Sequence, residues 1–167
     1  MMEVLIGMGS NLGDRERELC LAIDFLQTLS VKLVERSAVY ESEPFEFQSM
    51  NQFLNMCVSI EVESLTPMQL LASLKAYEKG RGRLGERVGE YSDRPIDLDI
   101  LFFSGLVWKD AALEIPHPEI ENREFVMVPL KELAPDFTHP LRLVSLEKCY
   151  STVSTHSVKN KGVLKCI

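Results

Sequence analysis

The sequence lacks the features that mark membrane, secreted and nucleic-acid-binding proteins. It contains no run of about 18 apolar residues, so we expect no transmembrane helix and no membrane partner. The amino terminus has no basic segment ahead of its short apolar run, which argues against a signal peptide. Basic residues are few, since 18 Lys and Arg stand against 25 Asp and Glu and the net charge is −7. This charge disfavours a nucleic-acid partner, whose binding needs many phosphate contacts.

Cysteine is scarce, and its spacing suggests no site. The four cysteines are Cys20, Cys57, Cys149 and Cys166, and no two of them form a C-x-x-C pair. This spacing argues against a zinc site. Because nothing indicates secretion, we expect four reduced, unpaired thiols in a cytoplasmic protein.

The residues that are present are typical of one ordinary globular domain. The chain has 167 residues, of which 46% are hydrophobic and 26% are charged, and it shows no internal repeat. A chain of this length can bury a hydrophobic core without disulfides or metals. We therefore predict a single domain over 1–167, with a core over 3–140 and a carboxyl-terminal extension over 141–167.

The first part of the chain predicts a strand, a helix and a second strand. The apolar run Val4–Met8 ends in a turn-forming cluster, Gly9–Asp14. Asp14 is suited to cap a helix over 15–29, in which apolar residues recur at helical spacing. The segment 31–42, rich in valine and in alternating residues, predicts the next strand.

The clearest period in the chain lies in residues 53–63, where apolar and polar side chains alternate. Period two predicts a strand with one face on the core and the other facing out. Thr66 then caps a helix over 67–80, and 95–103 predicts another strand. The order β-α-β-β-α-β indicates an α+β fold, a ferredoxin-like sandwich whose helices cover one sheet face.

Additions follow this core after Gly105. They comprise a proline-rich loop around His117, a short helix near 129–133 and a tail rich in Ser, Thr and Lys. Two prolines flank His117 and stiffen its loop, so the imidazole can be presented to a ligand, although a lone histidine is more commonly structural.

Two aspartates two positions apart are unusual in a strand. Asp97 and Asp99 point to the same face, and at about 6.5 Å their carboxylates repel by about 2.5 kcal/mol at an effective dielectric near 20. Cationic neighbours should offset this repulsion. The pair is either a solvated surface feature or a magnesium site that works with substrate phosphates. The alternate positions, which we expect to pack in the core, are Ile96, Leu98, Ile100 and Phe102.

A glycine-rich charged segment precedes this strand. Residues 75–94 carry six basic residues against four acidic ones, although the whole chain is acidic. Arginines beside paired carboxylates suit a metal–triphosphate ligand, and the glycines suit a loop that closes over it. The alternative is a solvated charged loop.

Two further residues do not fit a purely structural pattern. Phe53 lies on the polar side of its predicted strand beside Asn55. It is either an exposed surface aromatic or a stacking wall for a flat heterocycle whose edge Asn55 reads. Glu78 ends a buried helical stripe, where an acid is costly unless it is paired or functional.

With these residues assembled, the chain resembles the 6-hydroxymethyl-7,8-dihydropterin pyrophosphokinases. The resemblance runs from Val4 to about Pro140, and its motifs are specific in this order and spacing. They are Gly9–Asp14, Phe53–Asn55, Gly82–Arg83, Asp93–Leu101, Pro116–Pro118 and Asn122–Phe125. The family commonly has Trp-Gly-Pro-Arg where this chain has Tyr91–Arg94.

The resemblance implies a reaction in folate biosynthesis. Pyrophosphate would pass from ATP to 6-hydroxymethyl-7,8-dihydropterin, and AMP would be released. Asp97 and Asp99 would hold two Mg²⁺ ions, and Arg83 and Arg94 would neutralise phosphate charge as the other catalytic residues.

The resemblance also implies the residues that bind each substrate. The pterin ring would be sandwiched between two phenylalanines, and the pterin contacts would be Ser42, Glu43, Phe45, Phe53, Asn55 and Phe125. The ATP contacts would be Glu78, Arg83, Arg94, Ile100, His117 and Arg123. We expect a monomer or a weak homodimer.

Three other functions compete with this interpretation. A palm-type nucleotidyl transferase or cyclase also carries paired carboxylates, but it would usually need an acid on the first strand, where Val4–Met8 has none. A ferredoxin-like regulatory module would bind a small ligand without consuming ATP. An RNA-binding module of this topology would carry paired aromatic motifs on its central strands, and the net charge disfavours it.

Overall fold

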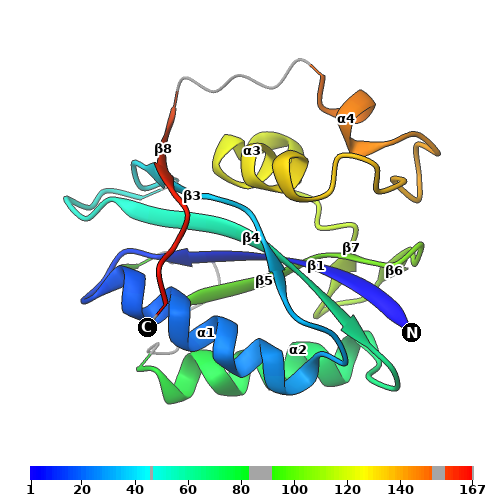
Figure 1. The fold of residues 1–167 in the computed structure, drawn as a ribbon, viewed down its shortest axis with the longest axis horizontal. Helices are drawn as coiled ribbons and strands as arrows, with labels where there is room; N and C mark the ends of the chain where they lie inside the picture. Colours follow the sequence, from blue (N-terminus) through cyan, green and yellow to red (C-terminus); the bar gives the residue numbers. More distant parts are fainter. Residues whose placement is uncertain (46, 83–91, 152–156, 167) are drawn as a thin grey trace.

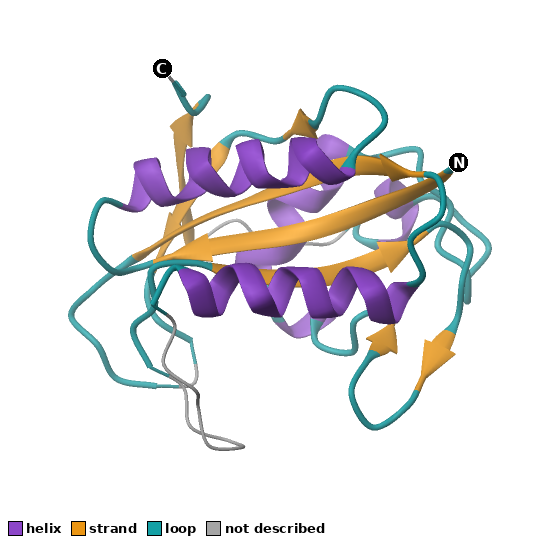
Figure 2. Cartoon of the chain, turned by 90° about the horizontal axis from the view of Figure 1, so that it is seen from below, coloured by secondary structure: helices purple, strands orange, loops and turns teal. Residues whose placement is uncertain are grey.

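One antiparallel sheet lies between two layers of helices (Figure 1). The computed structural model describes residues 1–45, 47–82, 92–151 and 157–166. The helices α1 (Arg15–Leu29) and α2 (Pro67–Gly80) cover one face, seen in front of the strands in Figure 2. The helix α3 (Glu124–Leu133) lies over the opposite face, so the protein has a helical layer that the sequence pattern did not predict.

Within the described residues, six strands form the main sheet, and each neighbouring pair is antiparallel. Five follow the order β5-β1-β4-β3-β8, and β2 pairs with β4 beside this path. The strands are β1 (Met2–Ser10), β2 (Glu35–Arg36), β3 (Val39–Ser42), β4 (Phe53–Val62), β5 (Asp97–Phe103) and β8 (Val158–Gly162). The remaining short elements are β6 (Trp108–Lys109), β7 (Glu114–Ile115), the 3-10 turn η1 (Ile120–Asn122) and α4 (Leu146–Cys149).

Local sequence sets the bounds of α1 and α2. The Asp14 carboxylate accepts the Arg17 N–H at 3.1 Å and caps α1. Thr66 and Gln69 form a capping box at the start of α2, whose first residue is Pro67. Both predicted helices are confirmed. Across the part of the chain that the structure describes, no helix combines the length and apolar character needed to cross a membrane.

The strand predicted over 31–42 is wrong in extent, because it divides into β2 and β3. Between them the Ser37 N–H still donates to the Cys57 carbonyl, but side chains replace the other backbone partners. The Ser37 hydroxyl accepts the Cys57 N–H at 3.0 Å, and the Ala38 N–H donates to the Glu132 carboxylate at 3.0 Å. These long-range hydrogen bonds interrupt a segment whose own residues favour continuous strand.

Helix α3 is longer than predicted and covers a sheet face that we expected to be open. It begins at Glu124 and contains Pro129, whereas the sequence pattern placed a short helix near 129–133 because proline favours the first turn. Beneath it, Asn55 and Cys57 on the outward face of β4 are buried. The prediction that this face is exposed is therefore wrong.

A β-bulge in β5 changes which residues share a face. Leu5 pairs with Phe102 but Ile6 pairs with Ile100, so Leu101 is the extra residue. Phe102 consequently packs in the cluster under α3, whereas Ile100 packs under α1 and α2. The prediction that Phe102 shares the face of Ile100 is wrong, because strict alternation cannot reveal an inserted residue.

The carboxyl-terminal extension folds back onto the core. Its strand β8 pairs with β3, and Leu164 is buried in the cluster that includes α1 (Figure 1). This path brings Cys166 to Cys20, and the two form a disulfide across 146 residues of sequence. Cys57 and Cys149 are free. The expectation of four unpaired thiols is thus wrong, because the spacing of cysteines says nothing about pairing made by the tertiary fold.

Candidate active site

A pocket of about 180 Å³ opens between the sheet and α3. Its walls come from β1, β3, β4, β5, the connection between β3 and β4, and the start of α3. Eleven of the predicted site residues line it: Ser42, Glu43, Phe45, Phe53, Asn55, Arg94, Asp97, Asp99, His117, Arg123 and Phe125. The fold therefore gathers residues that are widely separated in the sequence into one cavity.

Cationic side chains accompany the paired carboxylates, as their repulsion requires. Arg94 Nε lies 3.1 Å from Asp97 Oδ2, and Arg123 Nη1 lies 4.0 Å from Asp99 Oδ2. The carboxylates stay partly accessible, because the Asp97 and Asp99 side chains are 19% and 33% exposed. Carboxylate oxygens are ligands that Mg²⁺ prefers, and one or two of them suffice where substrate phosphates and waters complete the shell. The donor set at this edge of the pocket therefore fits a magnesium ion held jointly with a phosphate-bearing ligand.

Aromatic rings also line the pocket. Of the two alternatives for Phe53, the exposed surface aromatic is wrong, since Phe53 is only 7% exposed and lines the cavity. The Arg94 guanidinium lies 5.5 Å from the centre of that ring. Phe45 and Phe125 meet edge to face at 5.9 Å, and Phe47 meets Phe53 at 6.1 Å. These rings offer flat apolar surfaces to a planar ligand.

Buried polar groups also line the pocket. The Asn55 amide nitrogen donates to Ser42 Oγ at 2.9 Å and to the Tyr40 carbonyl at 3.3 Å, and all three residues are buried. These bonds hold the Asn55 amide in one orientation. A fixed amide beside a hydroxyl can read the donor and acceptor pattern at the edge of a heterocycle.

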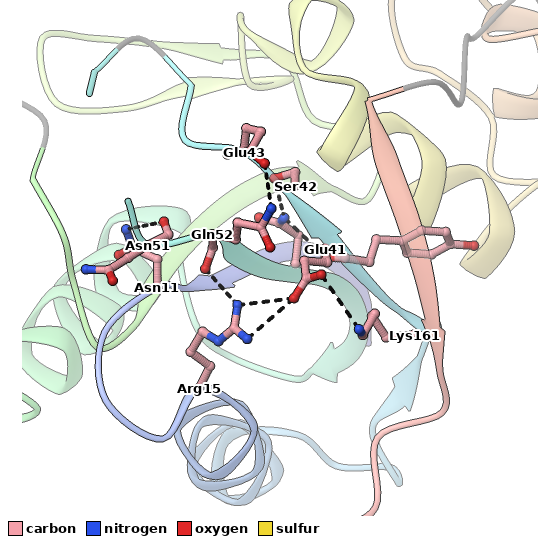
Figure 3. Close-up of polar contacts among 10 residues, drawn as sticks. Asn11, Arg15, Glu41, Ser42, Glu43, Asn51, Gln52 and Lys161 are labelled. Carbon is pink, nitrogen blue, oxygen red and sulfur yellow. Dashed lines mark hydrogen bonds and ion pairs between the residues drawn. The ribbon is translucent and has the colours of Figure 1, made fainter. Parts of the chain in front are cut away.

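Ion pairs tie the end of β3 to α1 and β8, and a hydrogen bond ties the connection between β3 and β4 to α1 (Figure 3). The Arg15 guanidinium donates to the Gln52 carbonyl at 2.8 Å and to Glu41 at 3.4 Å. Lys161 lies 3.6 Å from Glu41, and the Gln52 amide donates to Glu43. The segment that carries Glu43 is thereby anchored at both ends.

His117 lines the pocket, and one of its ring nitrogens is engaged by the backbone. Its Nδ1 accepts the Glu119 N–H at 3.1 Å, which leaves Nε2 to carry the proton toward a ligand. Burial lowers the pKa of His117 below its usual value, while nearby Asp99 raises it and Arg123 lowers it. The imidazole is therefore a neutral hydrogen-bond donor at neutral pH.

The structure also reveals anchoring residues that the sequence analysis did not single out. Asn11 accepts the Arg94 N–H at 2.8 Å through its side chain, and its own N–H donates to the Arg94 carbonyl at 3.2 Å. Asn11 further donates to Asp93 at 2.7 Å. Hydrogen bonds from Ser49, Asn51 and Asn11 lower the pKa of Asp93. Asn11 and Asp93 both lie in family motifs quoted above, and this membership was the only sequence feature that could have indicated their role.

Two glycines of β1 line the pocket, and a side chain at either position would crowd its neighbours. A Cβ atom on Gly9 would lie 3.3 Å from Asn55 Oδ1 and 3.5 Å from the Phe53 ring. On Gly7 it would lie 3.4 Å from Leu101. The first strand thus lets its neighbours approach closely at the point where the cavity forms.

Two predicted site residues, Glu78 and Ile100, are placed away from the pocket lining. Glu78 is 1% exposed, and its carboxylate accepts the Leu98 N–H at 2.7 Å and pairs with Lys75 at 3.1 Å. Ile100 is buried in the cluster under α1 and α2. The described pocket lining includes neither, so their contact with ATP stays a prediction. Arg83 lies outside the described residues.

Comparison with known proteins shows which family the chain is similar to. The family model for 7,8-dihydro-6-hydroxymethylpterin-pyrophosphokinase matches residues 5–135. A 2-amino-4-hydroxy-6-hydroxymethyldihydropteridine pyrophosphokinase of Porphyromonas gingivalis is 42% identical over 142 residues, which are 84% of this chain and 95% of that protein. The same enzyme of Aquifex aeolicus is 38% identical and covers 84% of this chain and 86% of its own.

Longer relatives contain this fold as one part. The folic acid synthesis protein fol1 of Pneumocystis carinii is 35% identical over 93% of this chain, which spans only 21% of that protein. A crystal structure of an HPPK-DHPS in complex with substrates matches 90% of this chain and 43% of its own, with a TM-score of 0.72 and 13% identity. This likeness shows the fold.

These matches first define a class: the chain is a transferase of the kinase type. In particular, it belongs to the 7,8-dihydro-6-hydroxymethylpterin pyrophosphokinase family, whose members serve folate synthesis.

Proposed function

We propose that this pocket binds ATP and 6-hydroxymethyl-7,8-dihydropterin together and transfers pyrophosphate between them, releasing AMP. The observation that carries the proposal is the shared cavity. Asp97 and Asp99 line one part of it, and Phe53 and Phe125 line another. A flat heterocycle and a metal–polyphosphate therefore have separate, adjoining surfaces in one space.

The aromatic part suits the pterin. Phe53 and Phe125 would stack on its two ring faces, while Asn55 and Ser42 would bond to its edge. The backbone near Glu43 and Phe45 would contribute further contacts. Burial of these groups excludes water and fixes the hydroxymethyl group in one orientation.

The charged part suits the phosphates. Arg94, Arg123 and the Nε2–H of His117 would donate to phosphate oxygens and offset the charge that develops in transfer. Magnesium, held by Asp97 and Asp99, would neutralise further phosphate charge when it is bound. The pterin hydroxyl would attack the β-phosphorus in line, and rate enhancement would come from positioning and charge stabilisation.

Other parts of the proposal rest on the family pattern. We propose that Arg83 joins the phosphate contacts and that Glu78 and Ile100 lie near the nucleoside. Asp97 would hold the metal, and Arg94, which pairs with Asp97 in this structure, would donate to a phosphate oxygen of the nucleotide.

We also propose that the core is a ferredoxin-like sandwich. The antiparallel order β5-β1-β4-β3, with α1 and α2 on one face, supports this description. The need for ATP supports a cytoplasmic location, and the net charge of −7 supports action without nucleic acid. We propose a monomer or weak homodimer.

One assay tests the proposed reaction. Purified protein is incubated with Mg²⁺, ATP and the reduced pterin, and the nucleotide products are separated. We expect AMP in equal amount to the pterin diphosphate. ADP would indicate an ordinary kinase, and binding of pterin without nucleotide turnover would indicate a binding module.

A further inference from the structure

The carboxyl-terminal strand β8 lies behind the pocket wall that carries Phe125. Val158 of β8 pairs with Ser42 of β3, and Ser42 lines the pocket. Val158 is buried with Ala38 and Tyr40, and Phe125 packs against this cluster. The strand therefore contacts two residues that line the cavity, Ser42 and Phe125, although the described lining includes no residue of β8.

Polar contacts hold β8 against α3 as well. The Ser157 N–H donates to the Glu124 carboxylate at 2.8 Å, and the Ser157 hydroxyl bonds to the same oxygen. Glu124 is the first residue of α3 and immediately precedes Phe125. The Asn160 amide donates to the Tyr40 hydroxyl at 3.3 Å, which in turn donates to Glu132 of α3 at 2.6 Å. Burial and the bond to Glu132 raise the pKa of Tyr40 to about 12, so this hydroxyl keeps its proton.

The far end of the strand is fixed covalently. After β8, Leu164 is buried in the core beside α1, and Cys166 is bonded to Cys20 of that helix. An edge strand that pairs with one neighbour alone is easily released. The disulfide closes this segment onto the domain and so favours the paired position of β8.

We propose that β8 positions Phe125 for the pterin, with Val158 as the positioning residue and the Cys20–Cys166 disulfide as the bond that holds the strand in place. This inference rests on the proposed role of Phe125 in pterin binding. Reduction by a dithiol would break the Cys20–Cys166 bond and leave two protein thiols. Two electrons and two protons would pass to the protein, and the dithiol would be oxidised to its own disulfide. The affinity for the pterin would then be lower when the two cysteines are reduced than when they are bonded. The affinity for ATP would not change.

The strand is tested with Val158→Ala. We expect the KM for the pterin to rise roughly three- to tenfold, with kcat and the KM for ATP near wild type, because Phe125 loses a packing partner and not a reacting group. The conservative change Val158→Ile, which keeps a branched apolar side chain, should leave the KM for the pterin near the wild-type value. The matched control is Val163→Ala, the same change at a position 70% exposed in the same segment. An unchanged KM in Val158→Ala would overturn the role of the strand.

The disulfide is tested by assaying oxidised and dithiothreitol-treated protein in parallel. We expect treatment to raise the KM for the pterin in the wild type and in Cys149→Ser, which both keep the disulfide before treatment. Cys166→Ser lacks the disulfide, so its KM should be raised before treatment and should not change with it. Equal KM values for oxidised and reduced wild type would overturn the role of the disulfide.

Phe125→Ala separates this inference from the proposed function. If it leaves the pterin KM unchanged, the pocket assignment itself fails. If Phe125→Ala raises the KM and Val158→Ala does not, the strand inference alone fails.

Discussion

Asp97 carries two roles that a substitution can separate. Its carboxylate pairs with the nearly buried Arg94, and the proposed reaction also needs it for magnesium. Asparagine keeps the shape and an acceptor oxygen but loses the charge.

For Asp97→Asn we expect turnover to fall by roughly 100-fold or more, because charge stabilisation of the transferred phosphate is lost. The melting temperature should stay within a few degrees of wild type. Steady-state rates and thermal melts of the same preparation measure both. Turnover near wild type would contradict the metal assignment.

The second residue-scale prediction concerns Phe53. For Phe53→Ala we expect weaker pterin binding by roughly 1–3 kcal/mol, the loss measured when an aromatic ring no longer stacks on a base. Titration calorimetry with the pterin measures it. Phe25→Ala is the control, since Phe25 stacks on Tyr77 at 4.2 Å outside the pocket lining and its loss should change stability without changing pterin affinity.

At the scale of elements, Glu78 joins α2 to β5. Its buried carboxylate accepts the N–H of Leu98 and pairs with Lys75, which accounts for an acid at the end of a buried stripe. A helix side chain thereby satisfies a backbone donor in the neighbouring strand.

For Glu78→Ala we expect the free energy of unfolding to fall by about 1–3 kcal/mol, because the Leu98 N–H is left buried without its acceptor. Urea denaturation measures this loss, and Glu63→Ala, at an exposed position, is the control. The KM for ATP of the same variant tests the nucleoside contact, since a purely structural Glu78 would leave it unchanged.

At the scale of the whole molecule, two histidines link stability to pH. Burial lowers the pKa of His117, and burial together with Arg142 lowers that of His139. The unfolded chain, with histidine pKa values near 6.5, therefore binds protons before the folded one as the pH falls.

We expect stability to be full above about pH 6.5 and to decline as the pH falls from there toward the lowered folded-state pKa values. Melting temperatures between about pH 8 and 5.5 measure this decline, a range that lies above most carboxylate titrations. His139→Gln should flatten the profile. A melting temperature that rises on acidification would contradict the effect of burial.

Local residues determined several features of this protein. The caps Asp14 and Thr66 fixed where two helices begin, and the alternation in 95–103 placed Asp97 and Asp99 on one face. These features depend on neighbours within a few positions, so a sequence pattern predicts them. The family motifs likewise indicated the residues that line the pocket.

Tertiary structure alone decided the rest. The cover of α3 over Asn55, the bulge at Leu101 and the disulfide between Cys20 and Cys166 depend on segments far apart in the chain. Periodicity and spacing report which face a residue takes within its own element, but not what later packs on that face. Whether a polar side chain meets water, a ligand or a second hydrophobic layer is set by long-range packing.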